Sequence, residues 1–294
     1  MTQQNEIFGI SELEQMKNEY GIDIPAESVK LPSGGIFYPP DHPFHRKDSV
    51  LIRAMTARDE DILLNEAYAK QKTTLDMLIS SCLVGKDRLP LEAKVNGQHT
   101  ISSLLLGDRN ALMLFIRLVS YGPEYSTEVK CPGCNVTNTT SFDLGLCAIH
   151  EPAHEPWQEG STEFIYHLEK LNRNIRVRLP TVADEKATMA LQERAKALKG
   201  KYGMTLGPES AIVTNTLKTQ ITAIEGKNGE WIQDGKALSQ IINHIPAMDS
   251  HAIRRFIKEC EPEIDMTQQF ECTGCGFTGE VEMPIGRKFF WPDA

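Results

Sequence analysis

Two CxxC motifs, far apart in the chain, restrict its possible folds more than any other feature. The first spans residues 131–134 (CPGC) and the second spans residues 272–275 (CTGC), 141 residues later. Each has strand-forming neighbours and an internal glycine, which is typical of a zinc knuckle that points two thiolates at one metal. A closed structural zinc site needs four ligands. The pattern therefore predicts one tetrathiolate site, with structural Zn²⁺ as the cofactor, formed by Cys131, Cys134, Cys272 and Cys275.

The same offset of 141 residues relates the segments that precede the two motifs. It maps four residues of one segment onto identical residues of the other, namely Asp108, Ala111, Phe115 and Ile116 onto Asp249, Ala252, Phe256 and Ile257. Further upstream, TARDE at residues 56–60 matches TVADE at residues 181–185, at an offset of 125. The change of offset requires an insertion in the second copy, which we place around 200–208. Matching order and a shared terminal motif predict an internal repeat.

These observations predict an α+β fold of two pseudo-repeats, each built as a strand, helices and a zinc-knuckle β-hairpin. The expected divisions are an irregular N-terminal arm over 1–49, a first repeat over 50–146, a linker over 147–174, and a second repeat over 175–294 that ends in an aromatic tail.

Capping and turn residues predict where several elements begin and end. A capping box at Ser11 to Glu14 predicts a short helix in the arm, and threonine or aspartate side chains predict four later helix starts. These starts, with the predicted short strand, apolar helix and hairpin turn, are Thr56, Asp108, Thr181 and Asp249, then residues 36–38, 74–83 and 228–229.

Other uses of the cysteines remain open at this point. Cys147 and His150 follow the first motif at a spacing that could close a local site with Cys131 and Cys134. A redox CxxC normally begins a helix, whose dipole lowers the thiol pKa, and neither pair precedes a helical pattern. Iron also accepts four thiolates, so spacing does not identify the metal. The remaining cysteines, Cys82 and Cys260, are expected to be buried as small apolar residues.

No catalytic grouping stands out. Residues 150–154 (HEPAH) fit the HExxH pattern of zinc proteases, but that chemistry needs both histidines on one helix face. Pro152 and Pro156 oppose a helix there. We find no Ser/His/Asp grouping and no phosphate-binding loop, so we expect no enzyme and no small-molecule substrate.

Charge and hydropathy narrow the environment. The chain carries 31 basic and 40 acidic residues, a net charge of −9, which opposes binding to nucleic acid. No apolar run approaches the roughly 20 residues that cross a bilayer, and residues 1–5 do not resemble a secretion signal. An odd count of seven cysteines fits a reducing compartment better than a disulfide framework.

Several segments resemble a known family. They are LPSGGIFY at 31–38, MTARDEDIL at 55–63, LGDRNAL at 106–112, SYGPEY at 120–125, the CPGC motif and FFWP at 289–292. Together they resemble the baseplate-hub and hub-assembly proteins of T-even-like contractile-tailed phages. The resemblance implies a non-enzymatic structural or assembly protein of the virion tail baseplate. It would be made in the host cytoplasm, and its partners would be other baseplate or hub proteins.

Two other functions are kept beside this one. The first is a cytoplasmic assembly chaperone that is absent from the mature virion. The second is a zinc-ribbon nucleic-acid adaptor, which the net charge opposes. Aromatic residues of the arm (Phe37, Tyr38 and Phe44) are expected to lie along another subunit. Those of the tail (Phe289, Phe290 and Trp291) either anchor a partner or fold back onto the core.

Overall fold

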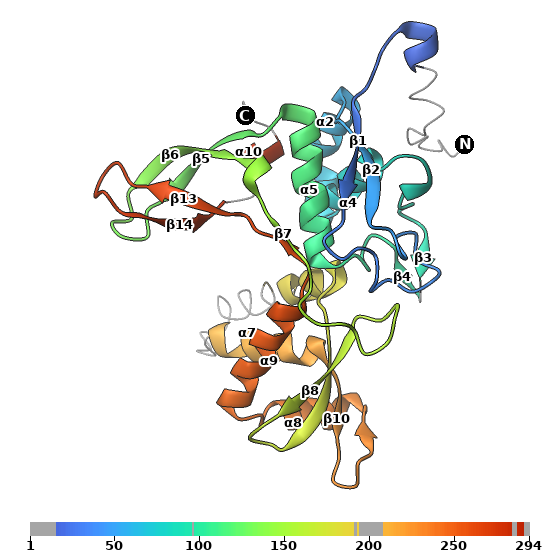
Figure 1. Cartoon of the computed structure of the whole chain (residues 1–294), viewed down its shortest axis with the longest axis vertical. Helices are drawn as coiled ribbons and strands as arrows, with labels where there is room; N and C mark the ends of the chain where they lie inside the picture. Colours follow the sequence, from blue (N-terminus) through green and yellow to red (C-terminus); the bar gives the residue numbers. More distant parts are fainter. Residues whose placement is uncertain (1–15, 96, 191–192, 194–207, 284–286, 291–294) are drawn as a thin grey trace.

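The protein combines helices with small antiparallel sheets, as the expected α+β class requires (Figure 1). A computed structural model describes residues 16–95, 97–190, 193, 208–283 and 287–290. The predicted capping box at Ser11 to Glu14 lies outside the described residues, as does nearly all of the proposed insertion. Within the described part of the chain, no helix is long and apolar enough to cross a bilayer.

The first half is organised around one long helix, α5. This helix packs against the β1–β2 hairpin and against α4, and the α2 and α4 helices contact each other (Figure 1). The elements are β1 (Ala26–Lys30), β2 (Ser49–Arg53), α2 (Ala57–Leu64), α3 (Glu66–Gln71), α4 (Thr74–Cys82), η1 (Gly85–Asp87), β3 (Lys94–Val95), β4 (Gln98–His99) and α5 (Leu106–Tyr121). The predicted apolar helix at 74–83 is therefore confirmed as α4.

The expected irregular arm is largely wrong. Residues 26–30 form β1, which pairs antiparallel with β2. The predicted strand at 36–38 is instead a run of turns, because Gly34 and Gly35 both adopt positive φ, +55° and +73°. A Cβ at Gly35 would lie 2.3 Å from the Phe44 carbonyl oxygen, so the chain can fold this tightly only with glycine.

The aromatic side chains of this segment are buried inside the protein. Phe37, Tyr38 and Phe44 are at most 2 % exposed, so they cannot lie along another subunit as expected. They stabilise the first half from within, and the segment from β1 to β2 belongs to that half.

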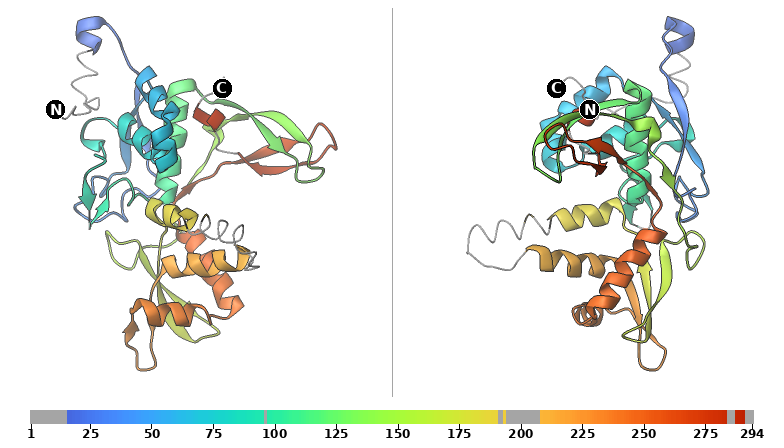
Figure 2. Two further views of the ribbon diagram at one scale, coloured as in Figure 1. Left: turned by 180° about the vertical axis from the view of Figure 1, so that it is seen from behind. Right: turned by 60° about the vertical axis from the view of Figure 1, so that its left-hand side comes forward.

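The second half contains a four-stranded antiparallel sheet of order β11-β10-β9-β8. Its elements are β8 (Glu163–Leu168), β9 (Arg173–Arg178), a helix over 182–190, α7 (Pro208–Gln220), β10 (Ile221–Glu225), β11 (Trp231–Ile232), α8 (Gly235–Ile242) and α9 (Ala247–Cys260). The helix over 182–190 and α7 lie side by side and project from the body (Figure 2, right). The predicted 228–229 turn is confirmed, since it joins β10 to β11. The expected linker, in contrast, contains β8.

Two β-hairpins extend from the ends of the long helices α5 and α9 and lie against each other (Figure 1). We call them the double hairpin: β5 (Glu124–Lys130) with β6 (Thr137–Asp143), and β13 (Thr267–Glu271) with β14 (Thr278–Glu282). Alternate side chains of each strand are buried between them. Short elements connect this region to the rest, namely η2 (Leu144–Leu146), β7 (Ile149–His150), β12 (Glu263–Ile264) and α10 (Arg287–Phe290).

The described part of the aromatic tail folds back onto the protein. Phe289 is fully buried in α10 and packs edge-on against Tyr125 of β5, with ring centroids 5.2 Å apart. Phe290 is 4 % exposed. Of the two alternatives for the tail, burial in the chain's own core holds for these two rings, while Trp291 lies outside the described residues.

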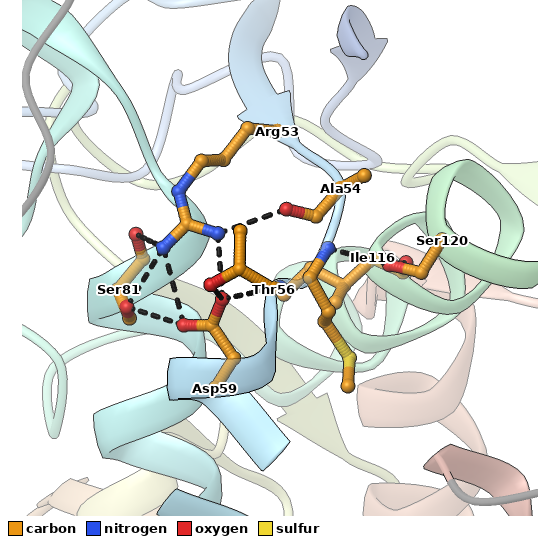
Figure 3. A network of polar contacts seen from close by, with 8 residues as sticks. Arg53, Ala54, Thr56, Asp59, Ser81, Ile116 and Ser120 are labelled. Carbon is orange, nitrogen blue, oxygen red and sulfur yellow. Dashed lines mark hydrogen bonds and ion pairs between the residues drawn. The ribbon is translucent and has the colours of Figure 1, made fainter. Parts of the chain in front are cut away.

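A buried polar network fixes the start of α2 (Figure 3). Thr56 is the N-cap and forms a capping box with Asp59, which confirms the predicted helix start. The Asp59 carboxylate also accepts hydrogen bonds from both terminal nitrogens of Arg53, at 2.6 and 3.1 Å, and from the Ser81 hydroxyl at 2.6 Å. Arg53 and Asp59 are both 0 % exposed, so the ion pair is sealed from water.

The second half has a matching arrangement 125 residues later. Thr181 precedes the helix over 182–190, and its amide and hydroxyl both donate to Asp184 at 2.9 and 2.8 Å. Asp184 also accepts from both terminal nitrogens of Arg178, at 2.7 and 2.6 Å. This ion pair is more open, with side chains 27 % and 16 % exposed.

The predicted capping roles of Asp108 and Asp249 are wrong. Helix α5 begins at Leu106 and α9 at Ala247, so each aspartate lies within the first turn. Their carboxylates bind the preceding β-hairpin instead. Asp108 accepts the Ser33 amide at 3.0 Å, and Asp249 accepts the amides of Lys170 and Leu171 at 3.1 and 3.0 Å. Each aspartate thus joins a helix to a hairpin from earlier in the chain.

Candidate metal centre

The two CxxC motifs meet at the tip of the double hairpin. The four Sγ atoms of Cys131, Cys134, Cys272 and Cys275 all lie within 4.8 Å of one another. The contacts run between motifs, with 3.7 Å from Cys131 to Cys275 and 3.6 Å from Cys134 to Cys272. A tetrahedral ion with Zn–S bonds of about 2.3 Å places its sulfurs about 3.8 Å apart. The four donors therefore fit a tetrathiolate metal site.

The first turn is shaped by hydrogen bonds around Cys131. Its amide donates to the Val136 carbonyl at 2.9 Å, and its carbonyl accepts the Asn135 amide at 2.9 Å. Asn135 adopts a positive φ of 61°, which closes the turn. The Gly133 amide donates to the Cys131 Sγ at 3.3 Å. Such amide-to-sulfur bonds orient the ligand atom and stabilise negative charge on it.

The second turn repeats these bonds residue for residue. The Cys272 amide donates to the Phe277 carbonyl at 2.8 Å, and the Gly276 amide donates to the Cys272 carbonyl at 2.9 Å. Gly276 has a positive φ of 71°. The Gly274 amide donates to the Cys272 Sγ at 3.4 Å. The two motifs thus have the same local geometry.

Each turn is also covered by a side chain of the other. A Cβ added at Gly133 would lie 3.6 Å from Phe277, and a Cβ added at Gly274 would lie 3.6 Å from Val136. Val136 and Phe277 occupy the same position in their motifs, five residues after the first cysteine. The sequence analysis did not single them out, although two apolar residues at this shared position are a usable signal.

Asn138 connects the two hairpins in one direction only. Its Oδ1 accepts from the amide and hydroxyl of Thr273, at 2.9 and 2.7 Å, and its Nδ2 lies 3.5 Å from the Cys272 Sγ. The equivalent position in the second hairpin is Gly279. Asn138 has no counterpart in the repeat, so no pattern in the sequence pointed to it.

The thiols differ in acidity because they are crowded. Burial alone raises the pKa of Cys272, but hydrogen bonds from backbone amides, including that of Gly274, lower this pKa to about 6. The Phe277 amide favours the Cys275 thiolate, yet neighbouring thiols, first among them Cys134, raise the pKa of Cys275 to about 12. One thiolate therefore opposes the next. A divalent cation at the centre would remove this repulsion and release the remaining protons.

The alternative local site does not assemble. The Cys147 Sγ lies 4.0 Å from the Met266 Sδ and 3.9 Å from the Gln268 Nε2, while His150 Nε2 lies 3.6 Å from an Asp265 carboxylate oxygen. Over the residues that the structure describes, the four CxxC cysteines are the group of His, Cys, Asp or Glu side chains close enough to share a metal ion.

The HExxH segment is likewise not helical. His150 ends β7, and His154 follows in a bend, with its Nε2 3.7 Å from Glu259. Cys82 and Cys260 are buried as expected, and burial raises the pKa of the Cys260 thiol to about 12.

Comparison with known proteins gives a family match. Residues 26–291 match the model of the family described as T4 bacteriophage base plate protein. Neither the curated proteins nor the solved structures contain a match. The matched region includes both long helices and both hairpins of the candidate metal centre. The chain therefore belongs to the T4 bacteriophage base plate protein family.

Proposed function

We propose that this chain is a non-enzymatic structural or assembly protein of the hub region of a contractile phage baseplate. It acts through contacts with other baseplate or hub proteins, and a structural zinc ion holds its two hairpins together. The family match over residues 26–291 carries the baseplate role. The proposed location is the virion tail, after synthesis in the host cytoplasm.

The zinc proposal is supported by the donor set. Four sulfurs from Cys131, Cys134, Cys272 and Cys275 lie within 4.8 Å, two from each hairpin. Structural zinc contributes on the order of 10 kcal/mol or more of apparent binding free energy, which is coupled to folding. An ion here would fix the orientation of two hairpins that begin at the ends of α5 and α9.

We also propose that the two halves are pseudo-repeats. The matching contacts of Asp59 and Asp184, 125 residues apart, support this proposal. So do the matching turns around Cys131 and Cys272, 141 residues apart. With the corrections given above, the first repeat takes in β1 and the second takes in β8. The ion would then lie between equivalent parts of the two repeats.

Metal content per chain tests the zinc proposal. We expect one zinc per wild-type chain by elemental mass spectrometry, and loss of that zinc in Cys272→Ser. Cys147→Ser is the matched control, because Cys147 lies outside the cluster, and it should keep its zinc. Zinc retained in Cys272→Ser and lost in Cys147→Ser would instead support the local site. Iron in place of zinc would correct the metal.

The second candidate is an assembly chaperone that leaves before the virion is complete. Quantitative mass spectrometry of purified virions separates the two functions. A structural protein should be present at a fixed ratio to other baseplate proteins, at a level that survives gradient purification. Its absence from virions that assemble only when the chain is expressed would establish the chaperone role.

A further inference from the structure

The four-stranded sheet of the second half carries an arginine held between two tryptophans. The guanidinium carbon of Arg176, on β9, lies 4.5 Å from the ring centroid of Trp231 and 5.6 Å from that of Trp157. Trp231 comes from β11, and Trp157 precedes β8, where its amide donates to the Glu163 carbonyl at 2.6 Å. Three separate segments thus converge on one cation.

Arg176 has no acidic partner among the described residues, unlike the next arginine on its face of β9. Arg178 makes a two-pronged ion pair with Asp184. The Arg176 side chain makes no hydrogen bond or ion pair there, and its Nε is buried without a partner. An unsatisfied buried donor costs about 1–3 kcal/mol. The protein therefore holds a charged group in place without neutralising it.

The stacking determines how a ligand can approach. Both flat faces of the guanidinium are occupied by indoles, so only its edge remains for a new contact. The edge of a guanidinium donates two parallel hydrogen bonds, which match the two oxygens of a carboxylate. Stacking also fixes the side chain beforehand, which reduces the entropy lost on binding. A single unpaired cation suits one carboxylate better than a polyphosphate chain, which needs several.

We propose that Arg176, Trp157 and Trp231 form a binding site for a glutamate or aspartate side chain on an extended segment of a partner protein. Trp157 is 54 % exposed and offers apolar surface beside the charge, where the flanking residues of that segment pack. The site is far in sequence from the cysteine cluster and does not depend on the metal. Its occupant would extend the proposed baseplate role by naming the chemistry of one contact.

The test uses the full chain and fluorescein-labelled (Glu-Ala)6, with (Gln-Ala)6 as the uncharged probe. Fluorescence anisotropy should show saturable binding of the glutamate peptide alone. In ¹⁵N NMR spectra, the indole N–H signals of Trp157 and Trp231 should shift, each assigned through a Trp→Phe variant. Arg176→Gln should weaken the Kd by about tenfold or more, the loss expected for a charged hydrogen-bond pair. Arg176→Lys should also weaken it, because an ammonium lacks the fork.

Arg173→Gln is the matched control. Arg173 lies on the same strand and its loss changes the net charge equally, but its terminal nitrogen contacts the Asn172 carbonyl instead. This variant should bind like wild type, and all variants should keep the wild-type melting temperature and zinc content. Equal binding of the two peptides, or unchanged binding by Arg176→Gln, would overturn the proposal. So would tighter binding of a thymidine oligonucleotide at the same indoles, which would indicate a base-stacking site.

Discussion

Removing the carboxylate of Asp59 should cost far more stability than removing the equivalent carboxylate of Asp184. Asp59→Ala leaves the Arg53 guanidinium without its counter-ion in a place where both side chains are 0 % exposed. Breaking a buried ion pair costs about 3–5 kcal/mol, and loss of the capping box adds about 1 kcal/mol. We therefore expect a loss of about 4–6 kcal/mol.

Asp184→Ala removes the same set of contacts from a wetter place. The side chains of Arg178 and Asp184 are 27 % and 16 % exposed, so water can solvate the arginine that remains. The expected loss is about 1–3 kcal/mol, mostly from the cap and the weakened hydrogen bonds. The two variants should then differ by roughly 3 kcal/mol, although they delete the same atoms.

Urea unfolding at pH 7 with saturating zinc measures both values from the midpoint and slope. Adding Arg53→Met to Asp59→Ala should recover part of the loss, because no charge then stays unpaired in the core. Equal losses from Asp59→Ala and Asp184→Ala would refute the reasoning. They would mean that burial of the ion pair does not control its contribution.

Three further predictions concern the tail, a buried acid and the metal centre. Phe289→Ala should lower stability by about 3–5 kcal/mol in urea unfolding, since the ring is fully buried against Tyr125; a near-neutral effect would contradict the burial. Burial raises the pKa of Glu261 from 4.5 to about 7, so stability should fall as pH rises from 4.5 to 7. Glu261→Gln should flatten that fall in unfolding curves and leave the variant more stable above pH 7. Asn138→Ala should weaken zinc affinity by about 10–100-fold in chelator competition, because the amide supports Cys272; unchanged affinity would show that this support is not needed.

Local signals in the sequence predicted the elements that depend on local chemistry. Thr56 with Asp59 three residues later predicted a helix start, and the structure confirms it because a capping box is complete within four residues. The turn at 228–229 was confirmed for the same reason. The meeting of the two CxxC motifs could be predicted because tetrahedral ligation requires four donors, and each motif supplies two.

Tertiary contacts decided the cases in which sequence reasoning failed. Asp108 carries the side chain of a good cap, but its carboxylate is engaged by Ser33 from 75 residues earlier. The segment around Phe37 reads as irregular, yet its aromatic rings fill the core of the first half. The stack on Arg176 joins three segments that no local pattern relates. In each case the partner is distant in sequence, so periodicity and spacing carry no trace of it.

The cysteine cluster has a consequence for biosynthesis. Half of its sulfurs leave the ribosome with residues 131–134 and the other half with residues 272–275, close to the end of the 294-residue chain. The first hairpin must therefore wait, with its thiols unmatched, while nearly half of the polypeptide is still being made. A chain that terminates early cannot complete the cluster, whatever else of it has folded. Closure of the double hairpin thus reports that translation has run to its end.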